Sequence, residues 1–278
     1  MNRKYFGIIV SAALALTVGS ALAGPLEDRV AAGETIRLGF AAAAPWAHPG
    51  EDGEPLGFVN QITIDLLGKM GHTNIEAVVT DWSGLIPSLM AGRVDIITGG
   101  MYILNARCEN IDFSEPIGQF GNAFIVPEGN PEGLQTYEDI KNAGVVLAAV
   151  AGYVNVEEAL KVGIADDNIM QLPGTTEVLA AVKSGRAAIG AMTFLEAADI
   201  AKKTDGIDAT DTNALPKWTF NWVGIGFHPE DDGFREAFNE GMAGYLGSEQ
   251  MMADVAQYDY VAGNIPDNTK TEWICANR

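Results

Sequence analysis

The sequence has little of the chemistry that most enzyme active sites use. It contains two cysteines and three histidines, and the histidines (His48, His72 and His228) stand far apart. No group of histidine, cysteine and carboxylate residues has the spacing of a metal site, and no nucleophile motif is present. We therefore expect no metal, no cofactor and no catalytic residue, and a chain that is not an enzyme.

Basic residues are also scarce. Lysine and arginine number 17 against 37 aspartates and glutamates, which gives a formal net charge of −20. Such an excess of negative charge repels both phosphate backbones and anionic lipid surfaces. We expect no nucleic acid and no membrane surface among the partners.

Long apolar runs are missing after residue 23. Before that point, two basic residues precede an apolar run over residues 6–18, and the small residues Ala21-Leu22-Ala23 come before Gly24. These are the three regions of a secretory signal peptide. A membrane anchor is the alternative, but the run is shorter than the roughly 20 residues that a spanning helix needs. We expect residues 1–23 to be a signal peptide and the mature protein to lie in the periplasm.

The two cysteines are Cys108 and Cys275. In an exported chain an even pair is more often a disulfide than a metal site. A bridge would tie the C-terminal tail to the segment that holds Arg107, whereas a disordered tail would leave two free thiols.

Apolar strands alternate with amphipathic helices along the rest of the chain, which predicts α/β lobes with mainly parallel sheets. The length suits two such lobes. One helix-to-strand unit occurs in each half with identical spacing: Leu85, Leu89, Gly92, Arg93 and Ile96 in the first, and Val178, Val182, Gly185, Arg186 and Ile189 in the second.

Two strands, at 122–127 and 221–228, can cross between the lobes, and two crossings imply a hinge over a cleft. We expect lobe 1 to comprise residues 24–125 and 223–278, and lobe 2 to comprise residues 126–222. Amphipathic helices at 234–246 and 248–258 would pack back on lobe 1.

A candidate ligand site lies in the stretch 99–116. Arg107 follows an apolar strand and the pair Gly99-Gly100, which places it at the carboxyl end of a strand, where open α/β sheets bind ligands. Its planar fork of donors suits a carboxylate. The alternative is a surface arginine in a loop.

The second half offers a facing wall. Asn155 can cap a helix with Glu158 three residues on, and the free N–H groups at that helix start could seat a carboxylate, although capping alone is the commoner role. Thr193 and Phe194 sit at the end of a strand. We expect Asn155, Thr193 and Phe194 to close over the ligand from lobe 2.

Several motifs together resemble family 3 of the extracellular solute-binding proteins, the receptors that feed ABC importers. The resemblance covers essentially the whole mature chain and rests on Gly57-Phe58, the Trp82-to-Leu89 segment with Gly92-Arg93-Val94-Asp95, the Gly100-Met101-to-Arg107 loop and Asp112-Phe113-Ser114-Glu115-Pro116. It implies a type II periplasmic binding fold, with two α/β lobes joined by two hinge strands. It also implies a permease as partner and a carboxylate bound by Arg107.

The sequence departs from the amino-acid receptors of that family. Those receptors usually carry threonines near the positions of Tyr102 and Leu104, and an acid near Thr193 that binds the α-ammonium group. We find no acid at that position. Loss of a buried counterion costs roughly 2–5 kcal/mol, which disfavours a common α-amino acid.

Aromatic residues could take over the role of the missing acid. Trp46, Trp82 and Tyr102 fall in loops at strand ends on the same rim as Arg107, and together they could cage a methylated or delocalised cation. Each of them alone could equally be ordinary core. The loop from Gly100 to Cys108 resembles the ectoine and hydroxyectoine receptors, which implies that these three aromatics and Arg107 hold the ligand. Those receptors carry an acid where this chain has Ala43, which leaves room for betaine-like or sulfonium zwitterions.

The sequence therefore predicts a monomeric periplasmic protein that delivers a zwitterionic compatible solute to an ABC importer permease. A signalling receptor and a periplasmic dehydratase on the same fold are the rival hypotheses. The expected ligand-binding residues are Trp46, Trp82, Gly100, Tyr102, Arg107, Asn155, Thr193 and Phe194.

Overall fold

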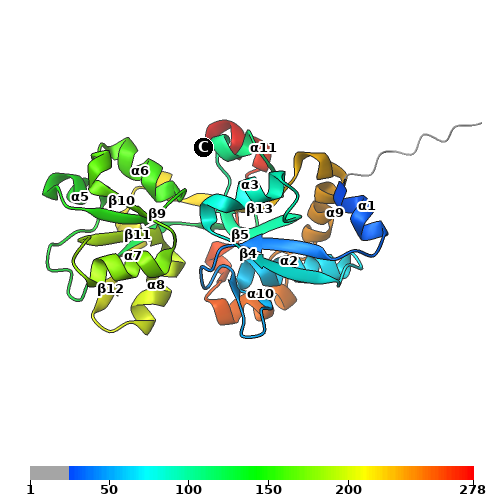
Figure 1. Ribbon diagram of the computed structural model, residues 1–278, viewed down its shortest axis with the longest axis horizontal. Coiled ribbons are helices and arrows are strands. Elements are labelled where there is room, and N and C mark those ends of the chain that lie inside the picture. The colour runs from blue at the N-terminus through cyan, green and yellow to red at the C-terminus, as the bar shows by residue number, and fades with distance from the viewer. Residues whose placement is uncertain (1–24) are drawn as a thin grey trace, which may run out of the picture.

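The computed structural model describes residues 25–278 and divides them between two sheets, each with its own helices (Figure 1). The expected signal peptide at 1–23 lies outside the described residues. Within residues 25–278 no helix combines the length and the apolar character needed to cross a bilayer. The predicted pair of α/β lobes is confirmed, because each of the two larger sheets forms one lobe together with its helices.

The sheet of lobe 1 has the strand order β4-β1-β5-β13-β6, with β7 also paired to β13. Its strands are β1 (Ile36–Phe40), β4 (Ile75–Val79), β5 (Ile96–Tyr102), β6 (Asp112–Phe113), β7 (Gly118–Phe120) and β13 (Asn221–Phe227). The first three run parallel, whereas β13 is antiparallel to β5. Every residue of β5 and β13 is buried, as in a strand that is covered on both faces.

Seven helices accompany that sheet among the described residues: α1 (Pro25–Ala31), α2 (Phe58–Lys69), α3 (Leu85–Met90), α4 (Asn105–Cys108), α9 (Asp232–Met242), α10 (Glu249–Val255) and α11 (Thr271–Asn277). Both α9 and α10 contact α2, so the predicted return of the C-terminal helices to lobe 1 is confirmed. A small hairpin of β2 (His48–Pro49) and β3 (Pro55–Leu56) extends from the same lobe.

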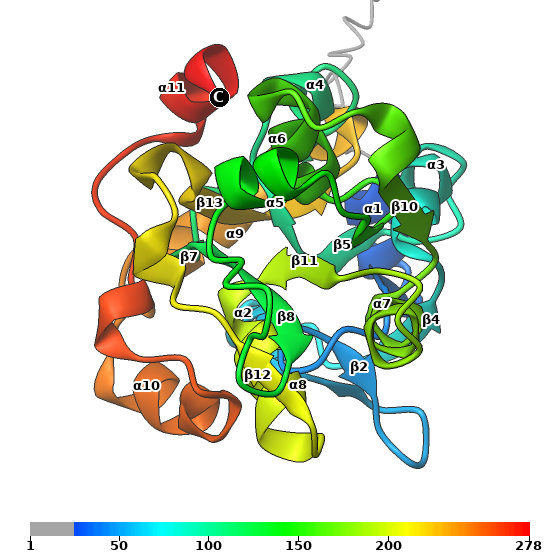
Figure 2. The ribbon, with the colours of Figure 1, turned by 90° about the vertical axis from the view of Figure 1, so that its left-hand side faces the viewer.

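The sheet of lobe 2 has the order β10-β9-β11-β8-β12. Its elements are β8 (Asn122–Pro127), α5 (Tyr137–Ala143), β9 (Leu147–Val150), α6 (Val154–Val162), β10 (Ile169–Leu172), α7 (Thr175–Lys183), β11 (Ile189–Thr193), α8 (Phe194–Lys203) and β12 (Ile207–Ala209). The consecutive strands β10, β9 and β11 are parallel, and β8 runs antiparallel to β11 and β12. Figure 2 shows this sheet end-on, with α5 and α6 on one side and α7 and α8 on the other.

The chain passes between the sheets twice. β7 ends in the first sheet at Phe120 and β8 begins in the second at Asn122. The return runs through residues 210–220, and β13 begins in the first sheet at Asn221. β8 pairs only within the second sheet, although the boundary that we expected between residues 125 and 126 falls inside it.

The helix-to-strand unit that the sequence repeats is present in both lobes, as α3 followed by β5 and as α7 followed by β11. Gly92 and Gly185 end the two helices with φ of 62° and 71°, a region that side chains with a Cβ rarely adopt. Their amides donate to the carbonyls of Leu89 at 2.9 Å and Val182 at 3.0 Å, so the two turns have the same hydrogen bonding.

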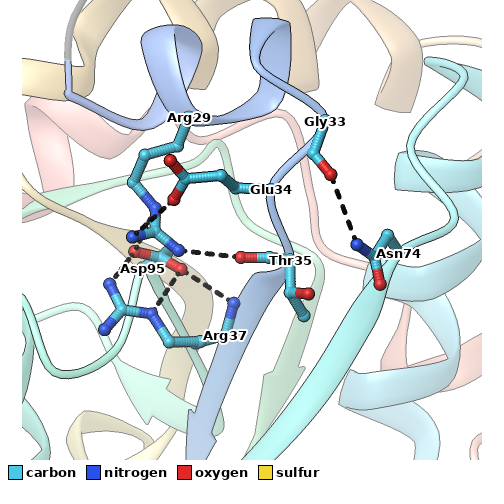
Figure 3. A network of polar contacts seen from close by, with 7 residues as sticks. All are labelled: Arg29, Gly33, Glu34, Thr35, Arg37, Asn74 and Asp95. Atoms are coloured by element: carbon cyan, nitrogen blue, oxygen red, sulfur yellow. Dashed lines mark hydrogen bonds and ion pairs between the residues drawn. The ribbon is translucent and has the colours of Figure 1, made fainter.

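A buried carboxylate fixes the first helix to lobe 1. Asp95 accepts from the backbone N–H of Arg37 at 2.8 Å and from its guanidinium at 2.9 and 2.6 Å, which raises the pKa of Arg37 (Figure 3). Arg29 of α1 lies 3.6 Å from the same carboxylate and donates to the carbonyl of Thr35 at 2.9 Å. This network holds α1 at the end of lobe 1 that lies away from lobe 2 (Figure 1).

Candidate functional site

A cavity lies between the two lobes, with about 310 Å³ of space that is partly open to solvent. Its walls come from both sheets, and the strand-end positions agree with the rule that open α/β sheets bind ligands at the carboxyl ends of their strands. The residues around it are Trp46, Trp82, Gly99, Gly100, Tyr102 and Arg107 of lobe 1, and Tyr153, Val154, Asn155, Thr193 and Glu196 of lobe 2.

Aromatic rings form the lobe 1 wall. Trp46 and Tyr102 meet edge to face, with centroids 6.2 Å apart, and both are buried. Gly100, in β5, has φ of 80°, and a Cβ built on it would overlap the indole of Trp46. A glycine is therefore needed here, because it lets the indole lie against the strand.

Arg107 projects from the short helix α4 beside that wall. Its guanidinium donates to the carbonyl of Tyr102 at 2.8 Å and to the carbonyl of Gly152, in lobe 2, at 2.9 Å. The guanidinium carbon lies 5.7 Å from the ring centroid of Trp82. Burial lowers the pKa of Arg107 to about 10, so the group stays charged at neutral pH with N–H donors left over for a ligand.

Tyr153 adds a fourth aromatic ring, from lobe 2. Its centroid lies 4.7 Å from that of Trp82 with the planes at 72°, and its hydroxyl donates to Glu196 at 2.7 Å. The sequence analysis missed this residue. Its position directly after β9 and Gly152 is the same kind of strand-end position that singled out the other aromatics.

An acid does line the cavity, so our expectation of none near Thr193 is wrong. Glu196 is 1% exposed, and its carboxylate accepts from the Thr193 amide at 2.9 Å and from the Thr193 hydroxyl at 2.8 Å. The two residues form a capping box at the start of α8, which brings the residue three positions on back beside the strand end. Burial raises the pKa of Glu196. With the Tyr153 hydroxyl as third donor, the carboxylate has one acceptor direction left.

Asn155 lines the cavity, but it does not cap its helix. α6 begins at Val154 with Tyr153 as N-cap and no side-chain cap, so the predicted capping box of Asn155 with Glu158 is wrong. Asn155 faces inward instead, where Nδ2 donates to the hydroxyl of Tyr137 at 3.1 Å and to the carbonyl of Met192 at 3.4 Å. Its Oδ1 is buried and has no partner among the described residues.

Direct hydrogen bonds join the lobes across the cavity. The indole of Trp46 donates to the Thr193 hydroxyl at 2.8 Å, and the indole of Trp82 donates to the Gly152 carbonyl at 3.1 Å. Seven of the eight residues expected in the site surround the one cavity, and Phe194 does not. As the first residue of α8, Phe194 is half-buried and packs against the hydrophobic core instead.

Three further residues singled out in the sequence lie outside the cavity wall. Ala43 is buried in a tight turn, where its amide donates to the carbonyl of Ala47 at 2.8 Å. Cys108 of α4 and Cys275 of α11 form a disulfide across 167 residues of sequence. The bridge therefore fastens the helix that carries Arg107 to the C-terminal helix.

Two α/β lobes, two chain crossings and a cavity lined from both sides define the class of type II binding proteins. Comparison with known families makes this specific. Residues 36–258 match the bacterial extracellular solute-binding proteins, family 3, and the chain belongs to that family.

Individual relatives agree with this family. The probable amino-acid ABC transporter periplasmic-binding protein y4tE of Sinorhizobium fredii is 31% identical over 279 residues, covering 96% of this chain and 92% of that protein. The crystal structure of EhuB in complex with hydroxyectoine matches with a TM-score of 0.82 and 25% identity, over 91% of this chain and 98% of that one.

A third likeness concerns the fold alone. The ancestral amino-acid-binding protein AncCDT-1, a precursor of cyclohexadienyl dehydratase, matches with a TM-score of 0.73 and 24% identity, over 84% of this chain and 98% of that one. The chain is thus a solute-binding protein of the kind that serves amino-acid-type ABC importers.

Proposed function

We propose that the protein is a periplasmic receptor that captures a zwitterionic compatible solute of the ectoine class and delivers it to an ABC importer permease. The observation that carries this proposal is the meeting of aromatic rings, a guanidinium and a carboxylate around one small cavity. The likeness to EhuB, whose structure holds hydroxyectoine, supports the same ligand class.

The aromatic walls suit a cationic head group. Trp46, Trp82 and Tyr102 come from lobe 1 and Tyr153 comes from lobe 2, each less than a tenth exposed. Ring faces attract a cation by about 0.5–2 kcal/mol each without demanding any particular hydrogen bond from it. A delocalised or alkylated cation is the head group that such walls hold best.

The opposite charge of the zwitterion has its own partner. Arg107 keeps N–H donors free beside the rings, and a guanidinium binds a carboxylate through paired hydrogen bonds. The first turn of α6, at Val154 and Asn155, adds backbone N–H groups on the other side of the cavity. A small ligand with a carboxylate a few ångströms from its cation therefore fits both ends.

Glu196 narrows the cation further. Its free acceptor direction favours a head group that carries N–H, as the cyclic amidinium of an ectoine does, and forms no hydrogen bond with a trimethylammonium or sulfonium group. The same carboxylate could receive the ammonium of an amino acid. An amino-acid-derived solute is therefore the second candidate ligand, and the amino-acid importers among the relatives agree with it.

Both lobes contact the proposed ligand, so binding would favour the arrangement in which they meet. Trp46 and Thr193 lie on opposite lobes and already share a hydrogen bond at the edge of the cavity. The ligand would thus be enclosed during transit to the permease.

The test is a calorimetric titration of the mature protein, with its thermal shift measured in parallel. Ectoine, hydroxyectoine, glycine betaine, dimethylsulfoniopropionate, arginine and glutamine are compared. We expect the two ectoines to bind most tightly and to raise the melting temperature by mass action. Tight binding of the amino acids without binding of the ectoines would overturn the ligand class. Conversion of the bound solute, followed by NMR, would overturn the receptor role in favour of an enzyme.

A further inference from the structure

Behind the lobe 2 wall of the cavity lies a buried carboxylate that the proposed binding scheme does not use. Glu158 of α6 is 4% exposed, and its Oε2 accepts from Asn122 Nδ2 at 2.7 Å and from the Tyr137 hydroxyl at 2.8 Å. Asn122 is the first residue of β8, directly after the first crossing between lobes. Hydrogen bonds therefore connect Glu158 to the first crossing between lobes and, through Tyr137, to Asn155 at the border of the cavity.

The direction of each hydrogen bond follows from the carboxylate. An ionised carboxylate only accepts, so the Tyr137 hydroxyl must donate its one hydrogen to Glu158. The oxygen of that hydroxyl is then an acceptor, and it receives Asn155 Nδ2 at 3.1 Å. The amide nitrogen of Asn155 consequently points into the lobe, toward Tyr137.

A second contact fixes the same orientation. Asn155 Nδ2 also faces the backbone carbonyl of Met192 at 3.4 Å, and a backbone carbonyl cannot donate. The remaining group of the amide, Oδ1, belongs to a side chain that is 0% exposed, borders the cavity and finds no partner among residues 25–278. A buried acceptor without a partner costs free energy unless something else supplies a donor.

We propose that Glu158 is a positioning residue that holds Asn155 with its oxygen toward the ligand, so that the site selects a solute with an N–H or O–H donor on its lobe 2 side. This inference rests on the proposed function, because it assigns the hydrogen-bonding character of the same site. It distinguishes ectoines, which carry amidinium N–H groups, from fully alkylated zwitterions, which carry none.

The charge of Glu158 responds to pH near neutrality. Burial raises its pKa to about 7, against hydrogen bonds from Tyr137, Asn122 and Asn221 and the attraction of Arg278. The other ionisable groups near it are Tyr102 of β5, which interacts with its charge, and Glu157 and Lys161 on its own helix, which line a pocket together with Glu158 and Arg278. Protonation gives the carboxyl group a donor of its own, so the Tyr137 hydroxyl is no longer forced to donate to it, and affinity for a donor-bearing solute should fall between pH 8 and pH 6.

The experiment compares Glu158→Gln with Glu157→Gln, which removes the same charge from an exposed neighbour on the same helix. The probes are ectoine and glycine betaine, titrated from pH 6 to pH 8. We expect wild type and Glu157→Gln to prefer ectoine and to lose several-fold affinity at pH 6. In Glu158→Gln, the ratio of ectoine affinity to glycine betaine affinity should fall about tenfold, and ectoine affinity should not change with pH. Tyr137→Phe, which lacks the hydroxyl between Glu158 and Asn155, should give the same two results.

Two results would overturn the inference. In the first, Glu158→Gln keeps both the wild-type pH dependence of affinity and the wild-type preference for ectoine. In the second, the pH dependence disappears only in Glu196→Gln. A measurement without ligand separates it from the proposed function. In NMR spectra, the side-chain amide signals of Asn155 should shift as Glu158 titrates, and this shift should vanish in Tyr137→Phe. If wild type binds neither probe but the shift is seen, the ligand class fails and the positioning role stands. Absence of the shift removes the positioning role, whatever binds.

Discussion

The indole nitrogen of Trp46 donates a 2.8 Å hydrogen bond to the hydroxyl of Thr193, which in turn donates to Glu196 at 2.8 Å. One threonine thus links the aromatic wall of lobe 1 to the acid of lobe 2. The same hydroxyl caps α8, so the start of that helix, the acid and the contact between lobes depend on a single side chain.

Replacing Thr193 by valine should affect stability and binding together. Loss of the N-cap costs about 1 kcal/mol, which lowers the melting temperature of a chain this long by roughly 2–4 °C. Thr136→Val provides the matched control, because Thr136 forms the same capping box on α5 and does not border the cavity. We expect both variants to melt earlier and Thr193→Val alone to bind ligand more weakly. Equal ligand affinities of Thr193→Val and Thr136→Val in calorimetry would argue against a role of Thr193 in the ligand site.

Removal of the guanidinium at Arg107 should weaken ligand binding at least about tenfold, since a hydrogen bond to a charged group contributes roughly 1.5–3 kcal/mol. The comparison is Arg107→Ala against Arg186→Ala, an exposed arginine in the turn between α7 and β11 of lobe 2. Calorimetry of the two variants with the best wild-type ligand measures the difference. Identical isotherms for both would exclude Arg107 as the carboxylate partner.

The ring of Tyr102 should matter more than its hydroxyl. That hydroxyl has only long contacts, at 3.5 Å, to the Gly121 carbonyl and to Asn122. Tyr102→Phe keeps the ring face and should bind within about twofold of wild type, whereas Tyr102→Leu should lose about 0.5–2 kcal/mol for a cationic ligand. Equal losses in the two variants would mean that the hydroxyl, and no cation–π contact, holds the ligand.

The disulfide should contribute to stability and to the position of Arg107. Opening a loop of 167 residues removes on the order of 5 kcal/mol in the chain-entropy model. We expect the double variant Cys108→Ser with Cys275→Ser to unfold at clearly lower urea concentration and to bind ligand more weakly, because α4 loses its tie to α11. Unchanged affinity in a destabilised variant would restrict the bridge to a structural role.

Stability should depend on pH through Glu158. Burial raises its pKa from 4.5 to about 7, so the native state holds this proton more tightly than the unfolded chain does. The resulting stabilisation is fully present below about pH 4.5 and is lost as pH rises through 7. Urea unfolding of wild type should lose about 3 kcal/mol relative to Glu158→Gln over that window. A constant difference between the two proteins would mean that the pKa is ordinary.

The features that could be predicted from sequence are those with a local physical signature. Gly92 and Gly185 follow helices whose apolar residues recur with helical spacing, so the repeated unit could be predicted without any tertiary information. Tyr102 ends a strand, whereas Trp46, Trp82 and Arg107 follow strands, and the strand ends of one sheet gather at one edge.

The misassigned residues depend on helix starts, which sequence fixes to within one or two positions only. The N-cap of α6 is Tyr153 in place of the expected Asn155, so Asn155 is an inward-facing amide, and the role of Tyr153 was missed. The segment from Thr193 to Glu196 does carry the capping-box pattern, and reading it would have revealed the acid. Because α8 begins at Phe194, this side chain packs against the core and does not border the cavity.

The two ends of the described chain are not equivalent places to attach an affinity tag or a dye. α1 is held by Arg29 and Asp95 at the end of lobe 1 that lies away from lobe 2 (Figure 1). Arg278, by contrast, accepts from the amide of Asn105 and donates to Phe220 and Asn221 at the return crossing. A fusion ahead of α1 should therefore leave the rate of ligand binding unchanged. A fusion after Arg278 would act on the return crossing itself, so a dye placed there should respond to movement of one lobe against the other.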